Sequence, residues 1–128
     1  MARILIVDDS RTTRKILKQI LENIGHEVVG EAVNGEEGIA RYKELNPDLT
    51  TMDITMPIVD GIEALRQIRE YDPHAKVLMV SAAGQKHKVL EAMKSGAVEF
   101  LLKPFEEEDI VERIKSVLGD GSMLQFRT

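Results

Sequence analysis

Short runs of apolar, β-type residues alternate with stretches of helical periodicity along almost the whole chain. The runs cover residues 4–7, 27–31, 48–52, 77–80 and 99–102. Each is followed by a segment whose apolar residues recur every three or four positions, as in amphipathic helices. Such alternation is typical of a parallel sheet covered on both faces, and right-handed crossovers leave few ways to connect it. We predict an α/β fold of the doubly wound, flavodoxin-like (βα)5 type, a five-stranded parallel sheet with strand order 2-1-3-4-5.

Helix-breaking residues separate these segments. Gly25, Pro47, Pro73 and Gly96 follow the first four helical stretches, and Pro104 precedes the last. In the first helix, apolar residues recur at helical spacing at Ile16, Leu17, Ile20, Leu21 and Ile24. The fourth helix runs through Leu90 and Met93. The last helix has a predicted buried stripe of Ile110, Val111, Ile114, Val117 and Leu118. The pattern stops at residue 119. We therefore predict one domain over residues 1–119 and a flexible tail over residues 120–128.

The composition is that of an ordinary globular domain. Hydrophobic residues make up 43% and charged residues 30% of the 128 residues, and the absence of cysteine excludes disulfides and thiolate metal sites. A formal net charge of −5 argues against nucleic-acid binding. No apolar stretch approaches the roughly 20 residues of a membrane span, and the run at 4–7 is too short for a signal peptide. We expect a cytoplasmic protein that binds neither nucleic acid nor membrane.

Two groups of basic residues are interpreted as ordinary surface features. Arg11, Arg14, Lys15 and Lys18 lie in the first helical segment, and a solvated helix face explains them better than a docking patch. The histidines His26, His74 and His87 lack the spacing of metal ligands, and we expect all three at the surface.

Polar residues with useful chemistry follow four of the five predicted strands. Asp8 and Asp9 follow the first strand, Asp53 the third, Ser81 the fourth and Lys103 the fifth. The carboxyl ends of parallel strands share one edge of the sheet, where ligands bind, so these side chains should converge. Three crowded carboxylates repel one another unless a cation is bound, and oxygen ligands without histidine or cysteine suit Mg²⁺. A carboxylate can also accept a phosphoryl group, whose oxygens a hydroxyl and an ammonium group would bind.

Each of these residues also has an ordinary structural explanation. Asp8 and Asp9 fit the N-cap of a helix equally well, with Ser10 as a competitor for that position. Asp53 is consistent with a turn residue, and neither Ser81 nor Lys103 is informative alone. The functional interpretation rests on their joint placement at four strand ends.

These residues belong to short motifs that together resemble the receiver domain of two-component signalling proteins. The motifs are VDDS at 7–10, MDITMP at 52–57, DG at 60–61, SA at 81–82 and KPF at 103–105. The likeness extends from about residue 3 to residue 118. It implies that Asp53 accepts a phosphoryl group from a phosphohistidine of a sensor histidine kinase, so the chain would be a signalling switch and not an enzyme.

The resemblance also implies roles for the surrounding residues. Mg²⁺ would be coordinated by Asp9, Asp53 and the backbone carbonyl of Thr55, with Asp8 acting largely through water. Ser81 and Lys103 would contact the phosphoryl group. Phe100 stands at the position of the family's switch aromatic, although packing in the core explains it equally well. The Lys103–Pro104 bond corresponds to one that is cis in receivers, a state that sequence cannot show.

The positions that modulate loss of the phosphoryl group in this family are occupied by Thr55 and Ala83. Neither side chain offers a carboxylate or an amide to orient water, so we expect hydrolysis that is not unusually fast. The stretches EAVNG, YKELNPD, MDITMP and SA-x-GQ are most similar to stand-alone chemotaxis regulators. That similarity implies a downstream protein target, with the flagellar motor switch as a candidate, and a monomer or weak dimer.

Other functions stay open at this point. The chain is also consistent with a phosphorelay intermediate or with a receiver cut from a longer regulator. A flavin- or nucleotide-binding enzyme is disfavoured because no glycine-rich phosphate loop follows a strand. A phosphatase that forms an aspartyl phosphate is a more distant alternative, since its two aspartates would be separated by one residue whereas Asp8 and Asp9 are adjacent.

Overall fold

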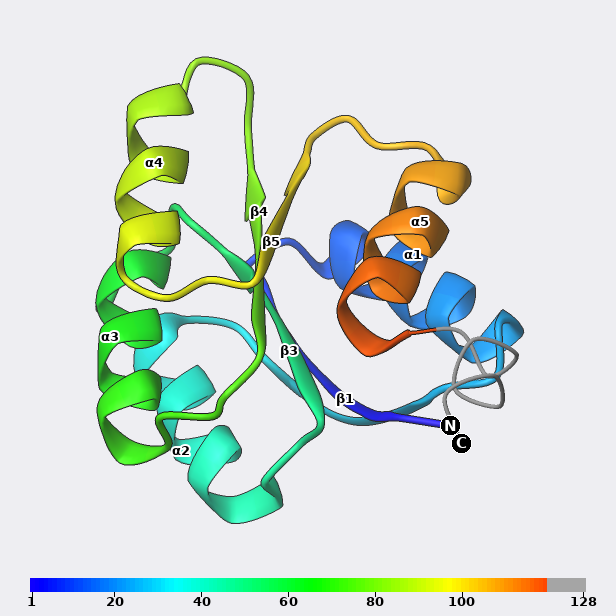
Figure 1. The fold of residues 1–128 in the computed structure, drawn as a ribbon, viewed down its shortest axis with the longest axis horizontal. Helices are drawn as coiled ribbons and strands as arrows, with labels where there is room; N and C mark the ends of the chain where they lie inside the picture. Colours follow the sequence, from blue (N-terminus) through cyan, green and yellow to red (C-terminus); the bar gives the residue numbers. More distant parts are fainter. Residues whose placement is uncertain (120–128) are drawn as a thin grey trace.

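The computed structural model of the protein describes residues 1–119, and the predicted tail over 120–128 lies outside the described residues. Strands and helices alternate throughout (Figure 1): β1 (Arg3–Val7), α1 (Arg11–Asn23), β2 (Glu27–Ala32), α2 (Gly35–Leu45), β3 (Leu49–Asp53), α3 (Gly61–Tyr71), β4 (Val77–Ser81), α4 (Lys86–Lys94), β5 (Glu99–Leu102) and α5 (Glu107–Leu118). The predicted alternation is confirmed. None of the helices in this range is long and apolar enough to cross a membrane.

The five strands form one parallel sheet in the order β2-β1-β3-β4-β5, as predicted. Helices α1 and α5 cover one face, and α2, α3 and α4 cover the other (Figure 1). The order places β1 beside both β2 and β3, at the point where the direction of winding reverses. A crevice at the carboxyl ends of the strands is expected there.

Alternating side chains divide the interior into two separate cores. In β1, Leu5 and Val7 point to the face covered by α2, α3 and α4, whereas Ile4 and Ile6 point to the face covered by α1 and α5. All four are at most 1% exposed. Strands buried on both faces are the expected result of helices covering a parallel sheet, and they explain the nearly continuous apolar runs in the sequence.

Side-chain caps fix the beginnings of three helices. Ser10 accepts a hydrogen bond from the backbone N–H of Thr13, and Asn34 and Asp60 accept corresponding bonds at α2 and α3. A reciprocal capping box begins α5. Caps of this kind satisfy backbone donors that have no partner within the helix. Helix α4 is different: within the described residues its N-cap side chain makes no such bond.

Burial departs from the helical pattern at several positions. In α1, Leu17 and Leu21 are buried but Ile16 is 42% exposed. In α4, the apolar residues Leu90 and Met93 are 58% and 38% exposed, because Val89 and Ala92 face the core instead. In α5, Ile110 and Ile114 form the buried stripe, whereas the other three predicted members, Val111, Val117 and Leu118, are only partly buried.

The histidines are not all ordinary surface residues. His74 and His87 are exposed, but His26 is partly buried and its Nδ1 accepts a hydrogen bond of 3.0 Å from the backbone N–H of Ala2. Burial lowers the pKa of His26, and the nearby amino terminus lowers it further.

The Asp60-Gly61 motif requires glycine for steric reasons. A Cβ atom at Gly61 would lie 2.0 Å from the carbonyl oxygen of Asp53 and 2.9 Å from the Cα of Ile54. The Gly61 N–H donates a 2.7 Å hydrogen bond to the Ile54 carbonyl at the same contact. The first turn of α3 is therefore held directly against the end of β3.

We predict that Gly61→Ala destabilises the fold by about 1–3 kcal/mol, because the contact atoms are backbone atoms that cannot move independently. The matched control is Gly30→Ala, whose added Cβ would meet side-chain ends and no backbone atoms, the Leu45 methyl closely and the Leu5 methyl at ordinary contact distance. Urea unfolding should show a clearly larger loss for Gly61→Ala than for Gly30→Ala. Equal losses would contradict the steric explanation.

Candidate functional site

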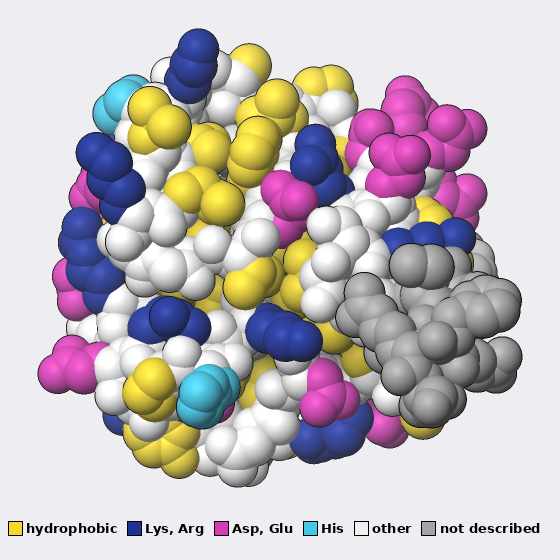
Figure 2. Space-filling view, in the orientation of Figure 1, with side chains coloured by type: hydrophobic (Ala, Val, Ile, Leu, Met, Phe, Trp, Pro, Cys, Tyr) yellow, Lys and Arg dark blue, Asp and Glu magenta, His cyan; other side chains and the backbone are white. Residues whose placement is uncertain are grey.

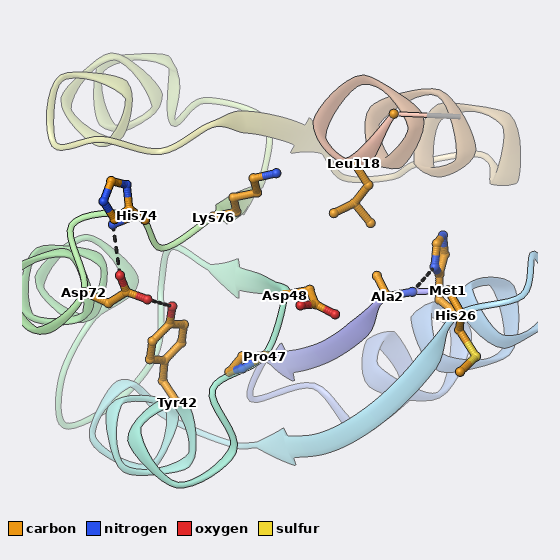
Figure 3. A pocket seen from close by; sticks show the side chains of 11 residues that line it. Met1, Ala2, His26, Tyr42, Pro47, Asp48, Asp72, His74, Lys76 and Leu118 are labelled. Atoms are coloured by element: carbon orange, nitrogen blue, oxygen red, sulfur yellow. Dashed lines mark hydrogen bonds between the residues drawn. The ribbon is translucent and has the colours of Figure 1, made fainter. Parts of the chain in front are cut away.

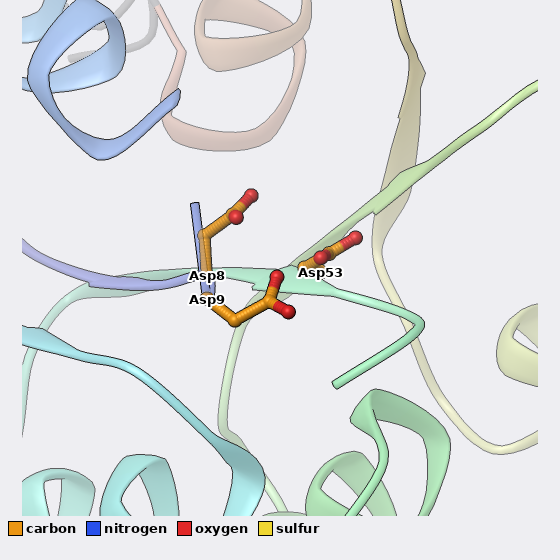
Figure 4. A group of neighbouring side chains, drawn as sticks. All are labelled: Asp8, Asp9 and Asp53. Carbon is orange, nitrogen blue, oxygen red and sulfur yellow. The ribbon is translucent and has the colours of Figure 1, made fainter. Parts of the chain in front are cut away.

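Three carboxylates meet at the carboxyl ends of β1 and β3. Asp8 and Asp9 follow β1, and Asp53 is the last residue of β3. One carboxylate oxygen from each lies within 4.8 Å of the other two, and Figure 4 shows the side chains grouped beside the two strand ends. Asp8 and Asp53 are only 1% and 6% exposed, while Asp9 is open to solvent. The predicted convergence of these residues is confirmed.

Lys103 supplies the balancing positive charge from the end of β5. Its Nζ lies 3.2 Å from Oδ2 of Asp8 and 3.6 Å from Oδ1 of Asp53. The following Lys103–Pro104 peptide bond is cis. The two distances show that the lysine contacts both buried carboxylates, although it is about 50 residues away from Asp53 in the sequence.

The surroundings strongly perturb the ionisation of Asp53. Its pKa is raised to about 7. Burial is the largest cause and the negative charge of Asp8 the next; the positive charge of Lys103 lowers the pKa, and Asp9 raises it. The side chain therefore titrates near neutral pH when no cation is bound. A bound cation stabilises a buried carboxylate of this kind, because it offsets the repulsion from the neighbouring carboxylates. A covalent change that removes the carboxylate's own charge has the same effect.

The alternative capping role of the Asp8-Asp9 pair does not apply, because Ser10 is the N-cap of α1. Asp8 instead accepts a 2.8 Å hydrogen bond from the Ser10 N–H through Oδ1, which orients its carboxylate. Arg14 donates to the Asp8 carbonyl and pairs with Glu31 at 3.0 Å. Arg14 is thus a structural residue of the site, whereas Arg11, Lys15 and Lys18 are exposed on α1, as predicted for a solvated face.

Ser81, at the end of β4, has a fully buried hydroxyl. The residue is 0% exposed, and its Oγ finds no hydrogen-bond partner among residues 1–119. A buried hydroxyl without a partner costs about 1–3 kcal/mol. Since most buried polar groups are paired, an unpaired one next to a polar site is consistent with a ligand-contacting group.

The remaining predicted residues surround this edge. Thr55 and Ala83 are exposed in the loops after β3 and β4. Phe100 is partly buried in β5 against the core under α2, α3 and α4, and the Arg113 guanidinium carbon lies 5.4 Å from its ring centroid. Core packing of Phe100 is confirmed; a switching role stays a prediction.

Gln85 is a site neighbour that the sequence did not single out. Its Nε2 donates a hydrogen bond of 2.5 Å to Oγ1 of Thr55, and its Oε1 accepts one of 2.8 Å from the backbone N–H of Ala82. The side chain therefore joins the loop after β3 to the loop after β4. Its only signal in the sequence was its place in the SA-x-GQ stretch.

A hollow of about 560 Å³ lies at the edge of the sheet opposite the carboxylates (Figure 3). Its polar groups bind one another: the Tyr42 hydroxyl donates to Asp72 at 2.8 Å, and Asp72 also accepts from the backbone N–H of His74. Burial, and then the hydrogen bond to Asp72, raise the pKa of Tyr42, and the same bond lowers the pKa of Asp72. These paired groups have a structural role, and the candidate functional site is the carboxylate group at the other edge of the sheet.

Comparison with known proteins assigns the chain to a family. The model of the response regulator receiver domain matches residues 4–115. The chain belongs to this family. It is 50% identical over 115 residues to the chemotaxis protein CheY of Thermotoga maritima, covering 90% of this chain and 96% of the relative. It is 47% identical over 119 residues to protein CcdB of Bacillus subtilis, covering 93% and 99%.

Solved structures agree with this assignment. A chain in the crystal structure of the CheX-CheY-BeF3-Mg complex from Borrelia burgdorferi is 41% identical, with a TM-score of 0.86 and coverage of 91% of this receiver and 88% of that chain. This receiver is a phosphorylation-activated two-component regulator close to the CheY chemotaxis regulators. As a class of protein it is a signalling switch.

We predict that the metal-free receiver loses stability as the pH rises from about 4 to about 7. The folded-state pKa of Asp53, about 7, exceeds its ordinary value of 3.8. Between these values the folded state holds a proton that the unfolded state has released, so the free energy of unfolding falls with pH.

The Asp53→Asn variant lacks this titration. Its stability relative to the wild type should therefore rise across the same window, by about 1–3 kcal/mol once screening by water is allowed for. Urea unfolding in a chelator, at about pH 5 and about pH 8, measures the difference. A relative stability that does not change with pH would contradict the raised pKa.

Proposed function

We propose that Asp53 is the phosphoacceptor of this receiver and takes its phosphoryl group from a phosphohistidine of a sensor kinase. The observation that carries the proposal is the position of the Asp53 carboxylate, buried beside Asp8 and within 3.6 Å of Lys103. In the transfer, an Asp53 oxygen forms a bond to phosphorus while the P–N bond of the donor breaks and the imidazole keeps the electron pair and is protonated. Such a transfer depends mainly on positioning and charge neutralisation.

The acidic cluster suits Mg²⁺ as the cofactor. Asp8, Asp9 and Asp53 offer only oxygen ligands, and the backbone carbonyl of Thr55 is the further protein ligand that the family implies. Bound Mg²⁺ would neutralise negative charge on the carboxylates and on the phosphoryl oxygens. A crystal structure of a relative that contains Mg, the CheX-CheY-BeF3-Mg complex, supports this choice.

Lys103 and Ser81 have separate tasks in the proposed mechanism. Lys103 holds Asp8 and Asp53 in place before transfer and is close enough to pair with a phosphoryl oxygen afterwards. The Ser81 hydroxyl, which has no partner among the described residues, gains one when it donates to another phosphoryl oxygen. Asp53 would be modified once and not turned over, which distinguishes the switch from an aspartyl-phosphate phosphatase.

We predict that a small phosphodonor and Mg²⁺ add one phosphoryl group to the protein, measured by intact mass. Labelling should require the metal and should be lost in Asp53→Asn. The matched control is Asp48→Asn, at the opposite edge of the sheet, whose side-chain oxygen can still accept from the Arg3 N–H. Stoichiometric labelling of Asp53→Asn would refute the acceptor assignment, and continuous turnover of a phosphate monoester would favour the phosphatase.

The output of the switch is proposed to be chemotaxis-type signalling through the surface of α4, β5 and α5. A hollow of about 400 Å³ lies between α4 and β5, with Leu90, Met93 and Phe100 among its lining residues. Figure 2 shows apolar side chains gathered over this end of the molecule. Exposed apolar residues around a groove suit a protein partner, and the flagellar motor switch is the candidate.

Similarity alone leaves the output class open. Chemotaxis proteins CheY of Bacillus subtilis and Listeria monocytogenes are 48% and 47% identical to this chain, but protein CcdB of Bacillus subtilis is also 47% identical. A cytoplasmic location, a domain of residues 1–119 and a monomer or weak dimer stay predictions of the sequence.

We predict that this receiver restores chemotactic spreading in soft agar to Bacillus subtilis lacking its own CheY. The wild type and Asp48→Asn should restore it, and Asp53→Asn should not. If the stable, labelled wild type fails while the host CheY succeeds, the chemotaxis proposal is contradicted and a phosphorelay role or another target gains support.

A further inference from the structure

The Gln85 side chain accepts a hydrogen bond from a backbone N–H at the edge of the proposed phosphorylation site. Its Oε1 accepts from the Ala82 N–H at 2.8 Å, and its Nε2 donates to Oγ1 of Thr55. Gln85 comes directly before α4, in a loop where Ala82, Ala83 and Gly84 are exposed. The bond to Thr55 joins this loop to the loop after Asp53, and the bond from Ala82 closes the loop after β4 on itself.

The direction of the Ala82 N–H follows from the alternation of the parallel sheet. The Val80 carbonyl faces β3, where it accepts from the Ile54 N–H, and the Ser81 carbonyl faces β5, where it accepts from the Lys103 N–H. Backbone groups of successive strand residues point to opposite sides. The Ala82 N–H therefore faces the β3 side again, next to the Asp53 end of that strand.

We propose that Gln85 is an internal competitor of the phosphoryl group. A phosphoryl oxygen on Asp53 needs donors, and the Ala82 N–H, beside the unpaired Ser81 hydroxyl, is the backbone donor at hand. In the unphosphorylated state the Gln85 carboxamide holds that donor. Phosphorylation displaces the carboxamide, so Gln85 is a positioning residue that sets how strongly the site binds the group. This inference rests on Asp53 being the acceptor.

The same side chain connects the site to the apolar groove. Gln85 lines the groove together with Leu90, Met93 and Phe100. Displacement of its carboxamide from Thr55 and Ala82 therefore changes the wall of the groove and frees the residue that begins α4. Within the described residues no side-chain cap fixes the start of helix α4, whose first turn is held by backbone hydrogen bonds and by the buried Val89. The event at Asp53 is thus coupled to the surface proposed for the partner.

The test measures the affinity of the metal-loaded protein for beryllofluoride, a mimic of the phosphoryl group, by fluorine NMR or calorimetry. Gln85→Ala removes the competitor, and the net contribution of a hydrogen bond predicts an affinity about two- to tenfold higher than that of the wild type. An unchanged or lower affinity would overturn the proposal. Urea unfolding checks that the variant remains folded.

Two further variants separate this effect from general loosening of the surface. Gln67→Ala is the matched control, because Gln67 bonds only to Glu63 on the exposed side of α3, and its affinity should equal that of the wild type. Thr55→Val removes the other end of the bridge and should also raise affinity. The double variant of Gln85 and Thr55 should show less than the sum of the two effects, since both changes break one bridge.

Amide exchange at Ala82 gives a readout that does not depend on affinity. Without beryllofluoride, the Ala82 amide should exchange faster in Gln85→Ala than in the wild type. With saturating beryllofluoride and Mg²⁺, both proteins should protect it equally. An Ala82 amide left unprotected in the complex would overturn the inference, whereas failure of the wild type to bind beryllofluoride in an Asp53-dependent manner would refute the acceptor itself.

Discussion

The charge balance between Lys103 and the carboxylates of Asp8 and Asp53 is the constraint on which the other features of this protein depend. Two nearly buried carboxylates share one ammonium group at the strand ends, and the exposed Asp9 adds a third negative charge beside them. The site therefore carries excess negative charge in a poorly solvated place. The parallel sheet order brings these distant residues together, and the first turn of α3 at Gly61 packs directly against the end of β3, which carries Asp53.

Topology made much of this site predictable. Because all carboxyl ends of parallel strands meet at one edge, the first polar residues after the strands identified Asp8, Asp53, Ser81 and Lys103 without any contact information. The bridge made by Gln85 was not predictable in this way. It depends on the conformation of one long side chain across two loops, and neither periodicity nor strand order specifies that.

Helical periodicity likewise could not decide which residues are buried in α4, beside the proposed partner surface. The pattern in α4 accommodates both Val89 with Ala92 and Leu90 with Met93 as apolar pairs, and the structure buries the first pair. The exposed pair contributes little to folding, and α4, at 9 residues, is the shortest of the helices in residues 1–119. A short helix with few anchors is the element expected to open at the lowest free energy.

The two cores described above share no residue. The sheet separates the two cores, so a side chain that is enlarged or trimmed under α1 and α5 lies on the other side of the strands from the residues under α2, α3 and α4. Substitutions on opposite faces should therefore behave independently. Selection can accordingly change side chains in one compartment while the other keeps the framework folded, and a single scaffold can be adapted to new circuits without being rebuilt.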